Sequence, residues 1–152
     1  AECVLPVVTA LAAQHDAEVL VVHAVGRPEM ACRAPVSRSD QNLADRLTER
    51  NRVEAARYLA EVQSQLSVPT QTRLLPSTRV AATLHQLVPD ENVDLVILSA
   101  HGYSGDARWP YGSIATSFID YGHGPVLVVQ DLARHEIAPL AAELAVEQHW
   151  GH

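Results

Sequence analysis

Apolar residues occur along this chain in two alternating patterns, helical spacing and short continuous runs. Helical spacing is clearest in residues 1–15 and 41–66, and a shorter helix is predicted to follow Ser77 or Thr78 and to end at the segment that begins with Pro89. Extended segments rich in branched side chains are predicted at residues 17–24, 68–75, 95–98 and 126–130. Because strands alternate with helices, the pattern predicts an α/β fold with a parallel sheet covered by helices on both faces.

The polarity of individual segments refines their expected places in this fold. The 68–75 segment alternates apolar with polar residues, so we expect it at a sheet edge. Ser37, Ser39 and Asp40 are candidate N-caps for the 41–66 helix. The expected buried positions are Leu43, Leu47, Ala55, Leu59, Val62 and Leu66 on that helix, and Ile114, Phe118 and Ile119 on a helix starting at Gly112–Ser113.

Residues 95–118 contain the stretch with the most distinctive chemistry. A buried apolar run, Leu95–Leu98, is followed by the small residues and glycine of Ser99–Gly102, a polar loop, and the helix that begins at Gly112–Ser113. Glycine lets a phosphate approach the backbone, and the bare N–H groups at a helix start attract anions. The loop is therefore consistent with phosphate binding or with a plain tight turn, because many α/β connections contain two glycines.

The composition and the charge exclude several classes of protein. The 152 residues suffice for one domain with its own core, and 47% hydrophobic against 19% charged residues is typical of a globular chain. The formal charge of −7 argues against an electrostatic nucleic-acid binder. No apolar run reaches the ~20 residues that cross a bilayer, and no signal peptide is evident. Cys3 and Cys32 have neither metal nor disulfide spacing, which favours free thiols and a cytoplasmic location.

The glycine loop and its flanking segments resemble the universal stress protein family. Gly102, nine intervening residues and Gly112–Ser113 reproduce the second part of the family's nucleotide motif, whereas Ser99 stands where the motif has its first glycine. The closing Pro125–Val129 strand is also similar to the family's last strand. The resemblance covers residues 1–131 and implies an α/β fold with an open parallel five-stranded sheet, strand order 3-2-1-4-5, and helices on both faces.

The same resemblance implies an adenine-nucleotide site. Backbone N–H groups would hold the phosphates over the loop and the helix start, and the Ser113 hydroxyl would donate to a phosphate oxygen. Arg108 is either a phosphate contact or a solvated charge, and His101 is expected to orient the ligand rather than to catalyse. The expected nucleotide-binding residues are Ala24, Val25, Leu98, Ser99, His101, Gly102, Arg108, Gly112, Ser113 and Ile114. The expected ligand is ATP or a related adenine nucleotide, with or without Mg²⁺.

One element of the family's fold is expected to be missing. In the family the first strand is central and ends near an aspartate that contacts the nucleotide, but this chain starts at the following helix. The sheet would then have a gap lined by unpaired backbone groups, which are costly to bury. We therefore expect that preceding residues are missing from the chain or that another segment fills the slot. The missing aspartate and Ser99 favour a loss of nucleotide binding, whereas the spacing from Gly102 to Gly112 favours its retention.

Three functions remain open at this point. The first is a regulatory protein of the stress response that binds ATP and switches partner contacts. The second is a dimeric interaction module of the same family that binds no nucleotide. The third is a nucleotide-hydrolysing enzyme, which would need a base and a metal carboxylate. No Ser/His/Asp, Cys/His or metal-ligand arrangement is legible, even with eight histidines, so no catalytic or metal residue is assigned and any hydrolysis is expected to be slow.

The last strand predicts a homodimer. Residues 126–130 lie at the sheet edge in the family and commonly pair antiparallel with their copy across a two-fold axis. Neither a nucleic acid nor a membrane is an expected partner. Beyond the domain of residues 1–131, the apolar spacing in residues 132–152 predicts a C-terminal helical extension.

Overall fold

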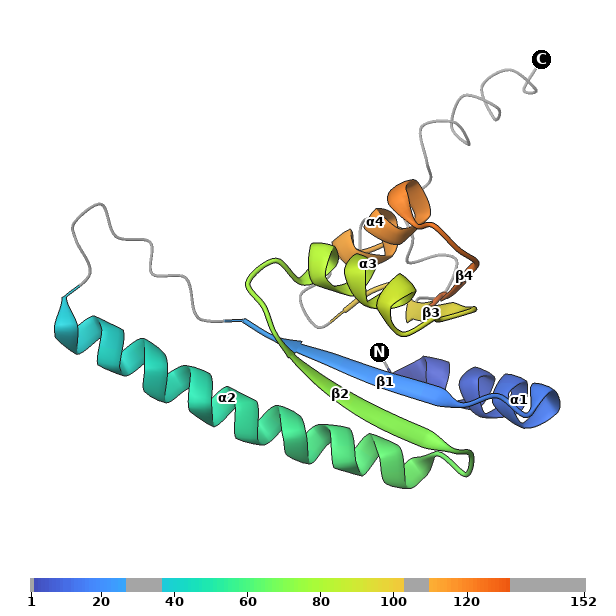
Figure 1. The fold of residues 1–152 in the computed structure, drawn as a ribbon, viewed down its shortest axis with the longest axis horizontal. Helices are drawn as coiled ribbons and strands as arrows, with labels where there is room; N and C mark the ends of the chain where they lie inside the picture. Colours follow the sequence, from blue (N-terminus) through green and yellow to red (C-terminus); the bar gives the residue numbers. More distant parts are fainter. Residues whose placement is uncertain (1, 27–36, 103–109, 132–152) are drawn as a thin grey trace, which may run out of the picture. The chain divides into compact units, whose positions relative to one another are not determined.

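The computed structural model describes residues 2–26, 37–102 and 110–131, and their elements are labelled in Figure 1. In chain order these are η1 (Glu2–Val4), α1 (Leu5–His15), β1 (Val19–Val25), α2 (Arg38–Gln65), β2 (Thr70–Pro76), α3 (Val80–Asp90), β3 (Val96–Ser99), α4 (Ser113–Tyr121) and β4 (Val126–Val129). They form two compact units. The first unit spans Leu5–Val93, and the second contains the described residues from Asp94 onward together with η1. The predicted C-terminal helix, residues 132–152, lies outside the described residues.

The first unit is built on the parallel pair β1–β2, with α2 running along it (Figure 1). The register runs from Val19 opposite Thr70 to Val25 opposite Pro76. All residues of β1 are half-buried, whereas β2 carries exposed polar residues at Gln71 and Thr72. Among the described strands, β2 pairs with β1 alone, as its alternating polarity predicts for an edge strand.

Helix α2 begins at one of the predicted caps. The Ser37 hydroxyl accepts a hydrogen bond from Asp40 N–H, and the Asp40 carboxylate accepts one from Ser37 N–H, each at 3.2 Å. This capping box satisfies donors that have no partner inside the helix. The His23 ring of β1 packs edge-on against the ring of Tyr58, at 5.7 Å between centroids, which fixes one helix face against the strand pair.

The buried stripe of α2 departs from the prediction at its N-terminal end. Ala55, Leu59, Val62 and Leu66 are buried as expected, but Leu43 is 51% exposed and its neighbour Ala44 is buried instead. Near the start of α2 the small side chain lies on the covered face and the large one in solvent. Hydrophobic periodicity alone assigns the larger apolar residue, Leu43, to the buried face, and this prediction is wrong here.

Helix α3 differs from the prediction at both ends. Ser77 accepts from Arg79 N–H at 3.0 Å in a turn before the helix, so the N-cap residue is Arg79 and not a hydroxyl residue. Pro89 lies inside the last turn, and the helix continues through Asp90. A proline lacks only one donor there, whereas Asn92, with φ of 52°, takes the left-handed conformation that stops helices.

The second unit is built on the parallel pair β3–β4, from Val96 opposite Val126 to Ser99 opposite Val129. Helix α4 connects the two strands and buries Ala115 and Phe118. Ile119 was expected on this buried face but is 51% exposed, while Ile114 is half-buried. Phe118 is buried as expected, and Ala115 is buried although its small side chain did not single it out.

The α/β class with parallel strands is confirmed. The described strands form two separate two-stranded sheets, β1–β2 and β3–β4. The expected order 3-2-1-4-5 counts the missing strand as the first. In that numbering the pair β1–β2 corresponds to strands 2 and 3, and the pair β3–β4 corresponds to strands 4 and 5. The full five-strand order, and what would occupy the central position, stay predictions.

Candidate functional site

The predicted glycine loop leaves β3 and returns to α4 through two arms that touch each other. Ala100 N–H donates to Val129 O at 2.7 Å, which extends the β3–β4 ladder by one residue. The carbonyl of the same Ala100 accepts from Gly112 N–H at 2.6 Å. Ala100, only 1% exposed, therefore ties the outgoing arm both to β4 and to the returning arm. Residues 103–109 and the predicted contact Arg108 lie outside the described residues.

The two glycines of the loop, Gly102 and Gly112, have different surroundings. A Cβ added at Gly112 would lie 3.3 Å from Ala100 O and 3.6 Å from the Cα of His101. Gly112 is therefore needed for the close approach of the two arms. Among the described residues, a Cβ added at Gly102 would meet no atom within 4 Å. The part of the fold that the structure describes therefore sets no steric need for glycine at position 102 and leaves space beside its backbone.

The start of α4 presents uncapped backbone donors. Its N-cap is Gly112, which has no side chain, and the first intrahelical bond runs from Thr116 N–H to Gly112 O at 2.9 Å. Within the described part of the chain, no acceptor is found for the N–H groups of Ser113, Ile114 and Ala115. A helix start with such donors carries a partial positive charge and favours an anion.

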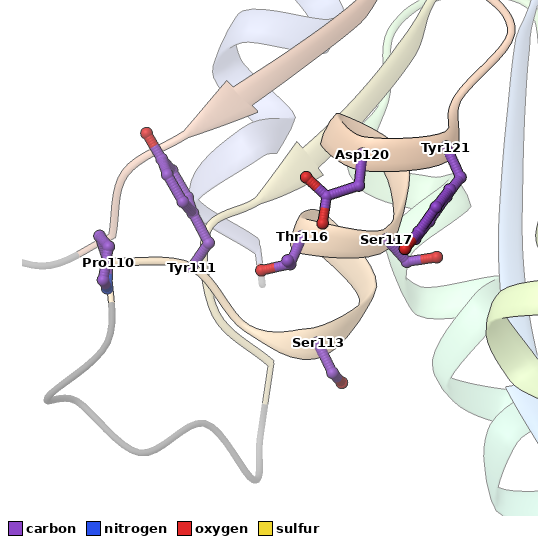
Figure 2. A pocket seen from close by; sticks show the side chains of 7 residues that line it. All are labelled: Pro110, Tyr111, Ser113, Thr116, Ser117, Asp120 and Tyr121. Atoms are coloured by element: carbon purple, nitrogen blue, oxygen red, sulfur yellow. The ribbon is translucent and has the colours of Figure 1, made fainter.

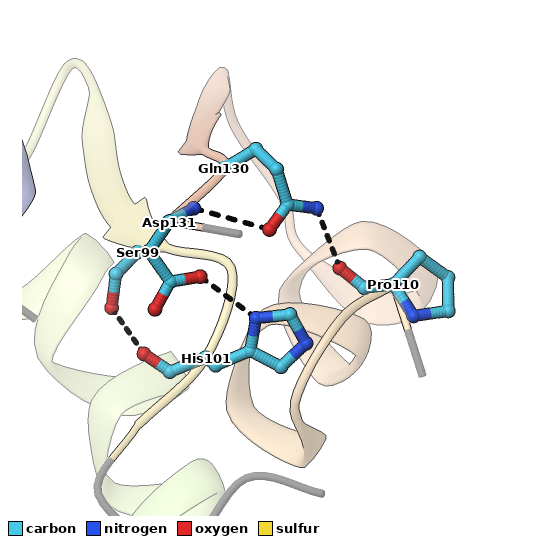
Figure 3. Close-up of polar contacts among 5 residues, drawn as sticks. All are labelled: Ser99, His101, Pro110, Gln130 and Asp131. Carbon is cyan, nitrogen blue, oxygen red and sulfur yellow. Dashed lines mark hydrogen bonds and ion pairs between the residues drawn. The ribbon is translucent and has the colours of Figure 1, made fainter. Parts of the chain in front are cut away.

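Ser99, the residue in place of the first motif glycine, uses its hydroxyl within the loop. Ser99 Oγ donates to His101 O at 2.6 Å (Figure 3). A hydroxyl has one proton, and a phosphate oxygen needs a donor, so this bond removes Ser99 as a phosphate donor in this conformation. The hydroxyl instead fixes the backbone between β3 and Gly102.

His101 is buried and paired with a residue that the sequence did not point to. His101 is 6% exposed, and its Nδ1 lies 2.7 Å from Oδ1 of Asp131, directly after β4 (Figure 3). Burial raises the pKa of Asp131, but hydrogen bonds from His101 and from its own backbone outweigh burial and hold that pKa below its ordinary value. The ionised carboxylate can only accept, so Nδ1 of His101 carries the proton.

The ten predicted site residues fall in different parts of the structure. Six lie on the β3 end, the loop arms and the α4 start of the second unit: Ser99, His101, Gly102, Gly112, Ser113 and Ile114. Leu98 is half-buried within β3 of the same unit. Ala24 and Val25 end β1 in the first unit, where Val25 O accepts from Ser77 N–H at 3.1 Å.

Sequence reasoning missed Gln130 and Asp131, which follow β4 directly. The available signal was their position, because ligands of open α/β sheets bind beyond the carboxyl ends of the strands. Polar residues at that end of the last strand were therefore candidates for the site.

A shallow pocket of about 450 Å³ lies along α4 (Figure 2). Its lining residues are Pro110, Tyr111, Ser113, Thr116, Ser117, Asp120 and Tyr121. Of the predicted nucleotide residues it includes Ser113 alone. The Asp120 carboxylate would repel a phosphate, so the anion site is better assigned to the N–H groups at the helix start than to this pocket.

Within the described residues, no three His, Cys, Asp or Glu side chains gather where they would hold a metal ion. None of the described helices has the length and apolar character needed to span a membrane.

Comparisons with known proteins agree on one family. The model of the Universal stress protein family matches residues 5–130. No curated protein sequence matched the chain. A solved structure of hypothetical protein MJ0577 is 19% identical, with 86% of this chain and 87% of that chain covered and a TM-score of 0.73.

Two further solved structures carry the family's name. Universal stress protein UspA from Lactobacillus plantarum is 16% identical over 84% of this chain and 88% of that chain, with a TM-score of 0.67. A universal stress protein family member from Burkholderia pseudomallei is 21% identical over 84% and 85%, with a TM-score of 0.58. At these identities the likeness establishes the fold.

Proposed function

We propose that this chain, which belongs to the universal stress protein family, binds ATP or a related adenine nucleotide at residues 98–115 and acts as a regulatory protein of the stress response. The observation that carries the proposal is the pairing of an uncapped helix start at α4 with open space beside Gly102. A phosphate needs both features, since it binds bare N–H groups and must come close to the backbone.

Each group at the site has a role in this proposal. The N–H groups of Ser113 and Ile114 bind phosphate oxygens, and the Ser113 hydroxyl adds a donor. Gly102 leaves room for the phosphates. The resemblance to the family makes Leu98, Ser99 and the backbone near Ala24 and Val25 the candidates to border the ribose and adenine. Arg108 and Mg²⁺ are further candidates for the terminal phosphates.

A second function rests on a specific observation at Ser99. Its hydroxyl is bonded to His101 O, and its side chain stands where the family's nucleotide motif has glycine. This arrangement favours a member of the family that binds no nucleotide and acts as a dimeric interaction module. In both functions the protein is proposed to be cytoplasmic and to form a homodimer. In the nucleotide-binding function, any turnover of ATP is proposed to be slow.

The substitution Gly102→Val separates the two functions. A Cβ at position 102 would meet no described atom within 4 Å, so the variant is expected to keep the wild-type melting temperature. The valine fills the space that the phosphates need, so ATP affinity measured by calorimetry with Mg²⁺ is expected to fall at least about ten-fold, which is a loss of 1.4 kcal/mol.

Gly124→Val is the matched control, because position 124 is also open and lies outside the loop. It is expected to bind ATP as the wild type does. If the wild-type protein neither co-purifies with an adenine nucleotide nor binds ATP in the calorimeter, the nucleotide function is wrong and the interaction module is supported. Equal affinities of wild type and Gly102→Val would place the nucleotide elsewhere.

A further inference from the structure

The end of β4 contacts both ends of the glycine loop. Asp131 holds the outgoing end, with its Oδ1 2.7 Å from Nδ1 of His101. Gln130 holds the returning end, with its Nε2 donating to Pro110 O at 3.0 Å. Figure 3 shows the two contacts side by side, one on each arm of the loop. Two consecutive residues therefore bridge to positions 101 and 110, between which the loop runs.

Both ends of the Gln130 carboxamide have partners. Its Oε1 accepts from Asp131 N–H at 3.1 Å while its Nε2 donates to Pro110 O. Because one partner is a donor and the other an acceptor, the carboxamide has one orientation that satisfies both. The same carboxamide thus connects the backbone before Asp131 to the returning arm.

The contact between Asp131 and His101 is the stronger of the two. His101 is 6% exposed and the Asp131 side chain 23%, so water screens the pair little. A hydrogen bond to a charged carboxylate is shorter and about twice as strong as a neutral one. Removing the carboxylate would leave a buried Nδ1–H without its acceptor, which costs more than the loss of a surface contact.

The two contacts are made to residues that lie next to the proposed phosphate site in the sequence. His101 directly precedes Gly102, and Pro110 lies two residues before Gly112. The bond from Gly112 N–H to Ala100 O joins the same two arms at their base. The position of Gly102 relative to the start of α4 is therefore set from β4, through side chains that would not touch the ligand.

We propose that Gln130 and Asp131 are positioning residues, which hold the two described arms of the glycine loop, residues 100–102 and 110–112, in the arrangement that binds phosphate. The inference deepens the proposed function and rests on it for the identity of the ligand. The holding of the loop itself is independent of any ligand. The two are therefore tested by separate measurements.

The first measurement uses the full chain without nucleotide. Asp131→Ala is expected to raise amide hydrogen exchange about ten-fold or more at residues 101, 102, 111 and 112, since a bond to a charged group is lost, and to leave exchange in α2 unchanged. Nitrogen-15 NMR of the His101 ring is expected to show the Nδ1–H form in the wild type and a mixture of forms in Asp131→Ala. Asp131→Asn keeps an acceptor oxygen and is expected to restore most of the protection.

The second measurement is ATP affinity by calorimetry. Asp131→Ala and Gln130→Ala are expected to weaken binding about ten-fold and about three-fold, in the order of the two contacts' strengths. Asp94→Ala is the matched control, because Asp94 is exposed in the same unit and its loss changes the net charge equally. This control is expected to leave loop exchange and affinity at wild-type values.

The outcomes distinguish the inference from the function. Unchanged exchange at residues 101, 102, 111 and 112 in both Asp131→Ala and Gln130→Ala overturns the inference, whether or not ATP binds. If the variants exchange faster than the wild type at these positions and the wild type binds no ATP, the positioning role is supported and the nucleotide function is wrong. Global acceleration of exchange in Asp131→Ala assigns Asp131 a general structural role and also overturns the inference, unless Gln130→Ala shows the change confined to the loop.

Discussion

Gly122 and Gly124 lie two positions apart in the turn before β4, and the structure places different demands on them. Gly122 ends α4, and its N–H donates to Phe118 O at 2.9 Å. A Cβ at position 122 would overlap that same carbonyl oxygen and also contact the Val126 side chain. A Cβ at position 124 would meet nothing within 4 Å.

Gly122→Ala is therefore expected to lower the free energy of unfolding by about 1–3 kcal/mol, because the end of α4 must shift to relieve the overlap. Gly124→Ala is expected to change it by less than about 0.5 kcal/mol. Urea denaturation of the two variants checks the difference. Equal destabilisation by both would show that the turn tolerates no side chain anywhere, which contradicts the distinction drawn from the packing.

At the residue scale the sequence predicted part of the candidate site. The sequence correctly placed a helix start at Gly112–Ser113, whereas the role of the spacing from Gly102 stays a prediction. It did not indicate Asp131, because the pair with His101 depends on how β4 is aligned beside β3. Spacing along the chain reports local geometry, whereas this contact joins residues brought together by strand pairing.

Helix α2 is the element with the clearest local determinant. It has 28 residues, of which Ala44, Ala55, Leu59 and Val62 are buried, and its first turn carries a complete side-chain cap. The capping box of Ser37 and Asp40 satisfies two donors at the first turn. The carboxylate of Asp40 also lies at the positive end of the helix dipole.

Ser37→Ala is expected to destabilise the protein by about 1 kcal/mol, the typical cost of losing a hydroxyl N-cap. Thermal unfolding followed by circular dichroism measures the change. Ser64→Ala is the control at the other end of the helix, where the Ser64 hydroxyl bonds only to Glu61 O, and its expected effect is below about 0.5 kcal/mol. A Ser37→Ala variant as stable as Ser64→Ala would contradict the role of the cap.

At the element scale, sequence periodicity predicted each helix and strand that the structure describes, but not every buried face. Leu43 and Ile119 were expected inside and are exposed, while Ala44 and Ala115 are buried. In both helices a small residue stands beside a large one, and the neighbour that covers the helix decides which of them is buried. Hydrophobicity within one segment carries no information about that neighbour.

For the whole molecule, the backbone of β4 has one edge paired and one edge facing away from β3. Val96 N–H donates to Pro125 O and Ala100 N–H to Val129 O, so residues 125, 127 and 129 direct their backbone groups toward β3. By the alternation of a strand, Val126 and Val128 direct theirs to the opposite edge. The proposed dimer would use that edge.

Val128→Pro is therefore expected to convert a dimer to a monomer while keeping the β3–β4 pair, because proline removes a donor from the outer edge only. Leu127→Pro is the matched variant, and it is expected to destabilise the second unit because it removes a donor of the β3–β4 ladder. Light scattering at micromolar concentration reports the mass, and circular dichroism reports the fold. A wild-type monomer, or a folded Val128→Pro dimer, would show that this edge is not the interface.

The sheet as a whole was predictable only in part. Alternating strands and helices indicated parallel pairing, which the structure has in β1–β2 and β3–β4. The five-strand order required a strand that this sequence does not contain in recognisable form. The hydrophobic pattern of the sequence therefore predicts the two parallel strand pairs, but not how they combine into one sheet.

The registers of those pairs have a consequence for how the chain folds. Val19 pairs with Thr70 and Val96 with Val126, so each strand pair must close a long segment of chain before its first contact forms. Closing a loop costs entropy that grows slowly with its length, by about 0.6 kcal/mol for each doubling. The β3–β4 pair closes the shorter segment and has the lower entropic barrier. From closure entropy alone, the unit that contains the glycine loop is expected to form first.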